Sequence, residues 1–252
     1  MRKETYKKTI FNFSFFNMLT YLTRIHKKLL KEGSLVEYLS YASGEIIIVV
    51  VGIILALYLN NWNQERKNHK LEIQYYQSIK NQLNEDRKTL IDVMDYDQGH
   101  FDQFVYAKRL YSLNDKNMID TLGKITLNMV KYGDFRRKSN VYQTLVNSGE
   151  IVIINNNKIK DCLQSLEENY MYINRLEENH ATIVFSQILP DLRQMEQLDP
   201  LKVEDTGALF SYKFQNYFDI LIILMTEKRE AYKQAENKIN STIELIDREL
   251  KD

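Results

Sequence analysis

The sequence predicts an all-α fold: a single transmembrane helix that continues into a long stalk helix, followed by an antiparallel helical bundle. Three observations support this prediction. Residues 46–64 contain no charged side chain, and about twenty apolar residues are what a helix needs to cross a bilayer. The two prolines, Pro190 and Pro200, leave the long stretch before them free of this helix breaker. Beyond residue 64, apolar residues recur at helical spacing.

These patterns divide the chain into three segments. Residues 1–33 form a basic, partly amphipathic N-terminus, residues 34–64 form the transmembrane helix with its core at 46–62, and residues 65–252 form the helical bundle domain. The phenylalanines and lysines of the first 17 residues fit an interfacial helix. They fit equally well a chain whose true start is Met18 rather than Met1.

The charges that flank the apolar segment predict its orientation. Residues 1–44 carry eight Lys and Arg against three acids, and basic flanks remain on the cytoplasmic side of a membrane. Arg66, Lys67 and Lys70 lie just beyond the segment and weaken this asymmetry. We expect a retained signal anchor with a cytoplasmic N-terminus and an exported C-terminal domain.

The first long helix is expected from about Ser34 to Tyr111. Ser34 and Glu37 match a capping box, and no stop signal follows the apolar segment. The stripe beyond the span has helical spacing. Its members are Leu71, Tyr75, Ile79, Leu83, Leu90, Met94, Phe101 and Phe104.

Shorter elements are expected in the middle of the chain. Residues 121–132 predict a short helix ended by Gly133, and residues 140–147 predict another, with Gly149 placed to cap it. Residues 150–154 have strand composition without a partner run, so we expect a buried extended connection.

Two more long helices complete the bundle. Residues 155–157 supply N-cap candidates for the first, which should end or kink before Pro190. Its apolar stripe comprises Ile159, Leu163, Leu166, Tyr170, Ile173, Leu176, His180 and Ile183. The last helix alternates steps of three and four, the heptad seam of a coiled-coil-like partner. This seam comprises Phe218, Leu221, Met225, Lys228, Tyr232, Ala235, Ile239, Thr242 and Ile246. Residues 220–225 are apolar all round and should be buried on several sides.

Two stretches of the chain resemble a known family. Residues 41–47 (YASGEII), 51–57 (VGIILAL) and 60–63 (NNWN) are similar to the N-terminal segment of a Bacteroidota single-pass membrane protein family, a domain of unknown function with serial number 6090. Residues 142–149 (YQTLVNSG) resemble its second signature. The resemblance implies a Gram-negative inner-membrane protein with a helical exported domain, and it implies no activity. The chain departs from the family pattern at Tyr58 and in its first 17 residues.

One pair of motifs has the spacing of a metal site. Glu177 and His180 form Glu-x-x-His, which di-metal helical bundles repeat on two helices, and Asp97 with His100 is the nearest second copy. Such a site needs further inward-facing carboxylates, for which Asp219 is the candidate. His180 also lies on an apolar stripe, where a packed histidine is commoner than a ligand. We therefore assign no catalytic residue, no metal and no cofactor, and keep these residues as metal candidates to be examined.

Five residues of the apolar helix are candidates for membrane or interaction roles. Glu45 opens the apolar run near the headgroups, where a structural role or pairing with a partner helix is favoured over ion handling. Gly52 and Ala56 have the small-xxx-small spacing that lets two spans approach closely. Tyr58 and Trp62 have the composition of an interfacial belt.

Charge and motif content indicate the class of function. Residues 65–252 carry 26 basic and 30 acidic side chains, so the basic run at residues 136–138 favours a solvated turn over a nucleic-acid site. The chain has no P-loop, dinucleotide fingerprint or nucleophile elbow. We expect a non-enzymatic envelope scaffold or accessory protein whose partners are the lipid bilayer and another protein or a second copy. The alternatives are a ligand-sensing bundle that signals through a partner, and a di-metal carboxylate enzyme.

Overall fold

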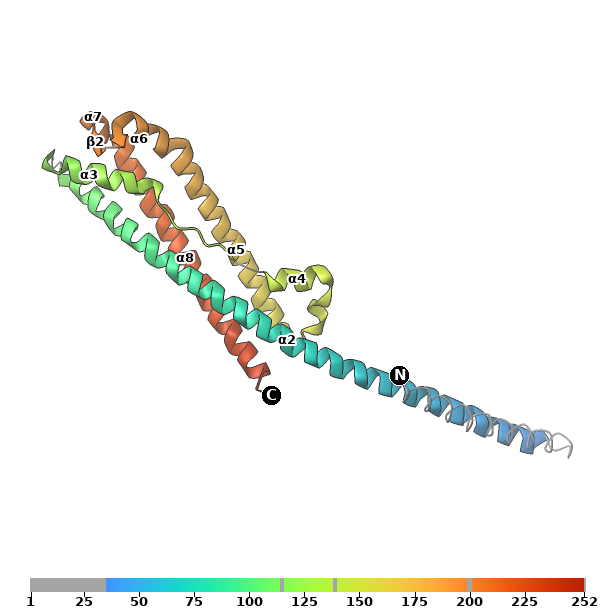
Figure 1. Cartoon of the computed structure of the whole chain (residues 1–252). Coiled ribbons are helices and arrows are strands. Elements are labelled where there is room, and N and C mark those ends of the chain that lie inside the picture. The colour runs from blue at the N-terminus through green and yellow to red at the C-terminus, as the bar shows by residue number, and fades with distance from the viewer. Residues whose placement is uncertain (1–34, 114–115, 138–139, 199–200, 252) are drawn as a thin grey trace, which may run out of the picture. The chain divides into compact units, whose positions relative to one another are not determined.

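The computed structural model describes residues 35–113, 116–137, 140–198 and 201–251, and these residues are almost entirely helical (Figure 1). The all-α prediction is therefore confirmed. The elements are α2 (Leu35–Leu113), η1 (Lys116–Met118), α3 (Ile119–Thr126), η2 (Leu127–Val130), α4 (Val141–Ser148), η3 (Glu150–Ile153), α5 (Asn157–Ile183), the π-helix η4 (Val184–Ile188), α6 (Leu189–Met195), β1 (Glu196–Leu198), β2 (Leu201–Val203), α7 (Thr206–Leu209) and α8 (Tyr212–Glu249). The chain divides into two units, Met1–Lys67 and Asn68–Asp252.

The first unit contains the apolar part of α2. The predicted long helix is confirmed, because α2 runs without interruption over 79 residues. Among the described residues, α2 is the one helix long and apolar enough to cross a membrane. Its large apolar side chains between Ile46 and Leu59 are exposed by 46–67%.

The second unit is a bundle of three long helices: residues 68–113 of α2, α5 and α8. Lys80 of α2 pairs with Asp247 of α8, and Lys108, further along α2, pairs with Asp219, nearer the start of α8. Helix α8 is therefore antiparallel to α2.

Helices α2 and α5 run in the same direction. Asn155, just before α5, bonds to Glu72, and Tyr170 of α5 bonds to Asp86, fourteen positions further along α2. The connection between these helices must therefore return along the whole bundle, and Figure 1 shows it doing so between α3 and α4.

We call this connection, residues 114–156, the crossover. Its first part differs from the prediction of a helix over residues 121–132. Helix α3 ends at Thr126, the tighter turn η2 ends at Val130, and Lys131 is extended with φ −105° and ψ 123°. Gly133 does not terminate a helix. It lies where the crossover passes close to α2, and a Cβ placed there would meet the side chain of Val93 at 2.9 Å.

The caps at Gly149 and within residues 155–157 were predicted correctly, and the cap at Asn140 was not predicted. The Asn140 side chain accepts the N–H of Gln143 at 2.9 Å, and Gly149 caps α4 with a left-handed φ of 75°. The Asn156 side chain accepts two amides of the first turn of α5. The expected extended connection at 150–154 is wrong for Glu150–Ile153, which form the short helical turn η3 with Val152 75% exposed, whereas Ile154 is extended and buried as expected.

The stripes of the two later helices are largely confirmed. All nine seam residues of α8 are buried, as are the α5 stripe residues except the half-buried Ile183. The π-helix η4 precedes Pro190, where the missing N–H interrupts regular helical bonding. Residues 220–225 are less enclosed than expected, because Ile223 is 58% exposed. The antiparallel hairpin of β1 and β2 was not predicted.

Two apolar clusters form the core of the bundle. One lies where α2 enters the bundle, and the other lies at the end that carries α3, α6 and α7. On each long helix, the residues of the first cluster and those of the second are separated by a short polar stretch, which locates the candidate functional site.

Candidate functional site

Four charged or titratable side chains lie between the two apolar clusters, and we call them the polar layer. They are Asp97 of α2, Glu177 and His180 of α5, and Lys228 of α8. Each is less than a tenth exposed. Charged groups this deep are stable only when they are paired and hydrogen bonded.

Asp97 and Lys228 pair with each other and with one residue of the crossover. Lys228 Nζ lies 3.1 Å from Asp97 Oδ2 and donates to the carbonyl oxygen of Gly133 at 2.8 Å. The other carboxylate oxygen, Asp97 Oδ1, accepts the Gly133 N–H at 2.7 Å. Both main-chain groups of Gly133 are thus satisfied by a neutral ion pair.

Glu177 holds the crossover two residues further on. Its Oε1 accepts the Phe135 N–H and the Tyr232 hydroxyl, each at 2.6 Å. Burial raises the pKa of Glu177, and the bonds from Phe135 and Tyr232 and the charge of Lys228 oppose this rise. Burial, followed by the charge of Glu177, also raises the pKa of Tyr232.

His180 has a different role in the polar layer. Its side chain is 1% exposed and stacks on Tyr132 with ring centroids 4.5 Å apart. Burial lowers the pKa of His180 to about 3, and the Lys228 charge acts in the same direction. Neither ring nitrogen has a hydrogen-bond partner among the described residues. The ring is therefore a neutral packing group against the crossover.

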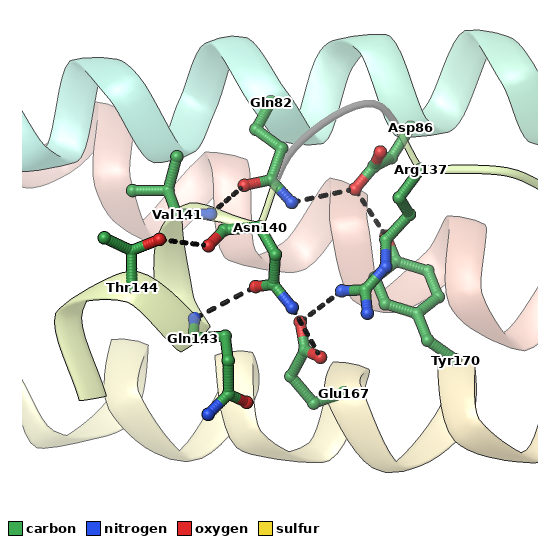
Figure 2. Close-up of polar contacts among 9 residues, drawn as sticks. All are labelled: Gln82, Asp86, Arg137, Asn140, Val141, Gln143, Thr144, Glu167 and Tyr170. Atoms are coloured by element: carbon green, nitrogen blue, oxygen red, sulfur yellow. Dashed lines mark hydrogen bonds and ion pairs between the residues drawn. The ribbon is translucent and has the colours of Figure 1, made fainter. Parts of the chain in front are cut away.

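A second polar cluster receives the crossover where it enters α4 (Figure 2). Gln82 Oε1 accepts the Val141 N–H at 2.7 Å, and Gln82 Nε2 donates to Asp86 at 3.2 Å. The Tyr170 hydroxyl also donates to Asp86, at 3.1 Å. Burial raises the pKa of Asp86, and the bonds from Gln82 and Tyr170 oppose this rise.

Arg137 corrects the expectation of a solvated basic turn. Its guanidinium pairs with Glu167 and lies 4.5 Å from the centre of the Tyr170 ring, as Figure 2 shows. Arg136 is exposed as expected, and Lys138 lies outside the described residues. A planar cation between a carboxylate and an aromatic face holds position better than a solvated one.

A third contact closes the crossover at the start of α5. Glu72 accepts the main-chain N–H of Asn155 at 2.6 Å, its side-chain amide at 2.9 Å and the Tyr76 hydroxyl at 3.0 Å. The amides of Gly133, Phe135, Val141 and Asn155 thus each bond to a buried side chain of α2 or α5. An irregular segment in a core needs such partners, because buried main-chain groups are costly when unpaired.

The sequence contained a signal for these residues that the motif search missed. Asp86 and Asp97 stand in the two gaps of the α2 stripe, where its spacing requires an apolar residue. Lys228 occupies the same kind of position in the seam of α8. Polar residues in a buried seam indicate a main-chain or side-chain partner from elsewhere in the fold.

The four metal candidates do not form one site. Asp97, Glu177 and His180 share the polar layer, but Asp97 and Glu177 are bonded to the crossover. The ring of His100 lies elsewhere, with Nδ1 3.1 Å from the Tyr96 carbonyl oxygen. Asp219 pairs with Lys108. In the described ranges, no three His, Cys, Asp or Glu side chains are arranged to hold a metal ion.

The five membrane candidates all lie on α2 in the first unit. Glu45, Ala56, Tyr58 and Trp62 are exposed, and a Cβ added at Gly52 would meet nothing within 4 Å.

A shallow hollow of about 230 Å³ lies beside the crossover. Its lining comprises Asp134, Phe135, Arg136, Asn174, Glu177, Glu178 and Ala181. One oxygen of Asp134 is buried without a partner, and burial raises the pKa of that carboxyl, against the charges of Lys228 and Arg136. One edge of the crossover is therefore accessible from solvent.

A comparison with protein families shows which family the chain belongs to. The sequence model described as "Family of unknown function (DUF6090)" matches residues 45–185. The chain belongs to the DUF6090 family. No curated protein and no solved structure matches it.

The DUF6090 match includes the apolar helix, the crossover and α5 to just past its end. Most of the residues that hold the crossover, from Glu72 to Glu177, therefore lie within the family region. Helix α8 lies outside it, although its Lys228 belongs to the polar layer and its Tyr232 donates to Glu177.

Proposed function

We propose that this DUF6090 protein is a membrane-anchored helical domain that acts by binding a partner protein in the bacterial envelope, as a scaffold, assembly factor or accessory subunit. The observation that supports it most is the use of the buried charges. Asp97, Glu177 and Lys228 are each bonded to the main chain of the crossover. Charges used in this way stabilise the path of the crossover rather than act on a substrate, so the proposed function is non-enzymatic.

The anchor in this proposal is the apolar part of α2. Exposed apolar side chains along several helical turns are stable when lipid covers them. The basic flank at residues 1–44 supports a cytoplasmic N-terminus, so residues 65–252 lie in the periplasm of a Gram-negative cell, with the anchor in the inner membrane. Gly52 and Ala56 offer a contact for the span of a second copy. The acidic balance of residues 65–252 argues against a nucleic-acid partner.

Membrane topology is the first test. Alkaline phosphatase and a fluorescent protein are fused in turn at the C-terminus and just before Ser34. The proposal expects phosphatase activity only at the C-terminus and fluorescence only before Ser34. The reverse pattern would place the bundle in the cytoplasm and contradict the envelope function.

Partner capture is the second test. The full chain, tagged at its C-terminus and produced at native level, is cross-linked in cells and purified in detergent. A reproducible protein partner that is recovered less when the bundle is destabilised by the substitution Lys228→Met supports the function. Repeated recovery of the chain alone would contradict it.

The hollow beside Phe135 favours one alternative, a bundle that senses a small ligand. A ligand bound there raises the thermal midpoint of unfolding by mass action. A metabolite panel against the purified chain tests this, with Glu178→Gln as the variant that alters the lining without touching the crossover.

A further inference from the structure

The crossover segment 131–137 lies in the bundle as a bound peptide lies in a groove. Among the described residues, the hydrogen bonds of the main chain from Tyr132 to Arg137 go to side chains and not to a neighbouring strand or helix. The partners come from three helices: Asp97 of α2, Glu177 of α5 and Lys228 of α8. We call the space between these helices the crossover groove.

Two positions give the groove selectivity for side chains. Gly133 is required because a Cβ would meet Val93 Cγ1 at 2.9 Å and Asp97 Oδ1 at 3.2 Å. Phe135 is 4% exposed and packs against Tyr170 with ring centroids 5.1 Å apart. Bonds to the main chain supply affinity and side-chain pockets supply specificity in peptide recognition generally. The groove therefore selects glycine followed, two residues later, by an aromatic residue.

The chain's own segment fits this groove imperfectly. One buried oxygen of Asp134 has no hydrogen-bond partner. Both ring nitrogens of His180, which stacks on Tyr132, also lack a partner. Each unpaired buried polar atom carries a free-energy cost. The hollow lined by Asp134, Phe135 and Arg136 leaves one edge of the segment open to solvent. Withdrawal of the segment would hydrate these atoms, but it would also break the bonds to Asp97, Glu177 and Lys228. A second extended main chain that replaces those bonds would therefore favour withdrawal.

We propose that the crossover groove is a binding site for an extended peptide, that residues 131–137 occupy it in the free protein, and that a partner polypeptide with a Gly-x-aromatic segment displaces them. The proposal rests on the partner-binding function and specifies the chemistry of the partner. The groove recognises an extended main chain through Asp97, Lys228 and Glu177, and the aromatic side chain through the pocket beside Tyr170.

The test uses the full chain in nanodiscs and a fluorescent peptide of residues 131–137, KYGDFRR. Gly133→Ala weakens the chain's own segment, so this variant is expected to bind the peptide saturably in an anisotropy titration. The wild-type chain should bind at least about tenfold more weakly, because its tethered segment competes at high effective concentration. Gly99→Ala, where a Cβ meets nothing within 4 Å, should behave as the wild type does. A peptide with the F135A change should not bind.

Several outcomes would overturn the proposal. One is absence of binding to a Gly133→Ala chain that retains its helix content and a cooperative unfolding transition. Another is a folded dimer of that variant that excludes the peptide, because it would show exchange of segments between two copies. A captured envelope partner together with either result would leave the partner-binding function standing and remove only the groove.

Hydrogen exchange of the wild-type chain decides the matter if Gly133→Ala does not fold. The amides of Gly133 and Phe135 are expected to exchange through a local opening, before the core amides of α5 and α8. Exchange of these two amides only on global unfolding would show a permanent core segment and would contradict the proposal.

Discussion

Asp97 and Lys228, on helices that run in opposite directions, bond to the two main-chain polar groups of Gly133. The carboxylate of Asp97 accepts the Gly133 N–H at 2.7 Å, and the ammonium of Lys228 donates to the Gly133 carbonyl oxygen at 2.8 Å. The two charges also pair with each other at 3.1 Å. One residue of the crossover thus ties α2 to α8 at the boundary between the two apolar clusters.

Removing the lysine of this arrangement should be severe. Lys228→Met leaves Asp97 buried without its counter-ion, and breaking a buried pair in this way costs about 3–5 kcal/mol. Urea unfolding followed by circular dichroism measures the loss. The double change Asp97→Asn with Lys228→Met should cost less than the sum of the two single changes. The exposed Lys233, replaced by Met, is the matched control and should shift stability by less than about 0.5 kcal/mol.

Gly133→Ala should destabilise the bundle by about 1–3 kcal/mol, the usual cost of overpacking a filled core. The added Cβ would meet Val93 Cγ1 at 2.9 Å, so Val93→Ala in the same chain should recover part of the loss. Gly99→Ala is the contrasting change, expected to stabilise α2 by up to about 1 kcal/mol through helix propensity. Equal effects of the two alanines on the thermal midpoint would refute the close approach described here.

His180 should make the bundle sensitive to acid. Its folded pKa, about 3, lies below the ordinary value of 6.5, so the unfolded chain binds the proton more tightly. The contribution of His180 to the free energy of unfolding therefore falls by about 1.4 kcal/mol for each pH unit below 6.5, until the folded pKa is reached. Denaturant titrations at pH 7, 6 and 5 measure this slope. His180→Phe should flatten it.

Glu177 should have the opposite effect on the pH dependence. Its folded pKa is raised by burial, so the folded state binds the proton more tightly than the unfolded chain does. This contribution to stability is therefore lost as the pH rises from the ordinary value of 4.5 through the folded value. Glu177→Gln keeps an oxygen acceptor for the Phe135 N–H and abolishes the dependence. A comparison of both chains in the His180→Phe background isolates the effect, and identical slopes would argue against the raised pKa.

The proposed anchor predicts a selective effect of charge. Ile54→Lys puts an ammonium in the middle of the apolar helix, at a cost of about 2.5–3.5 kcal/mol for insertion into a bilayer. The variant should be extracted from membranes by alkaline carbonate, while Met171→Lys on the exposed face of α5 should remain in the pellet. Retention of both variants would argue against a transmembrane position for residues 46–62.

Patterns that depend on near neighbours could be read from the sequence, and those that depend on distant partners could not. The stripes of α5 and α8 follow from periodicity, and Asn140, Asn156 and Gly149 act within one turn of their own helices. The path of the crossover depends on partners far away in the chain, such as Asp97 for Gly133. Local composition therefore suggested that residues 121–132 would remain helical to Gly133.

The role of the polar layer also could not be predicted from local sequence. The Glu-x-x-His spacing of Glu177 and His180 was recognised, but spacing alone does not distinguish a metal ligand from an acceptor for the Phe135 amide. Ile223 was expected to be buried because its neighbours in sequence are apolar. Its exposure follows from its position between Leu221 and Met225, off the buried seam of α8, so the seam was the better guide than the apolar composition of the six residues.

The parallel arrangement of α2 and α5 also affects the order in which the domain assembles. The contacts that complete the polar layer link positions far apart: Lys228 to Gly133 over 95 residues and Tyr232 to Glu177 over 55 residues. Distant contacts form slowly, because the entropy of loop closure is lost before any bond is gained. Until α8 docks, Asp97 and Glu177 are hydrated carboxylates and the crossover has no cation to bind. The contacts of α5 with α2, which span 83 and 84 residues, and those of α8 should therefore all form long after the individual helices.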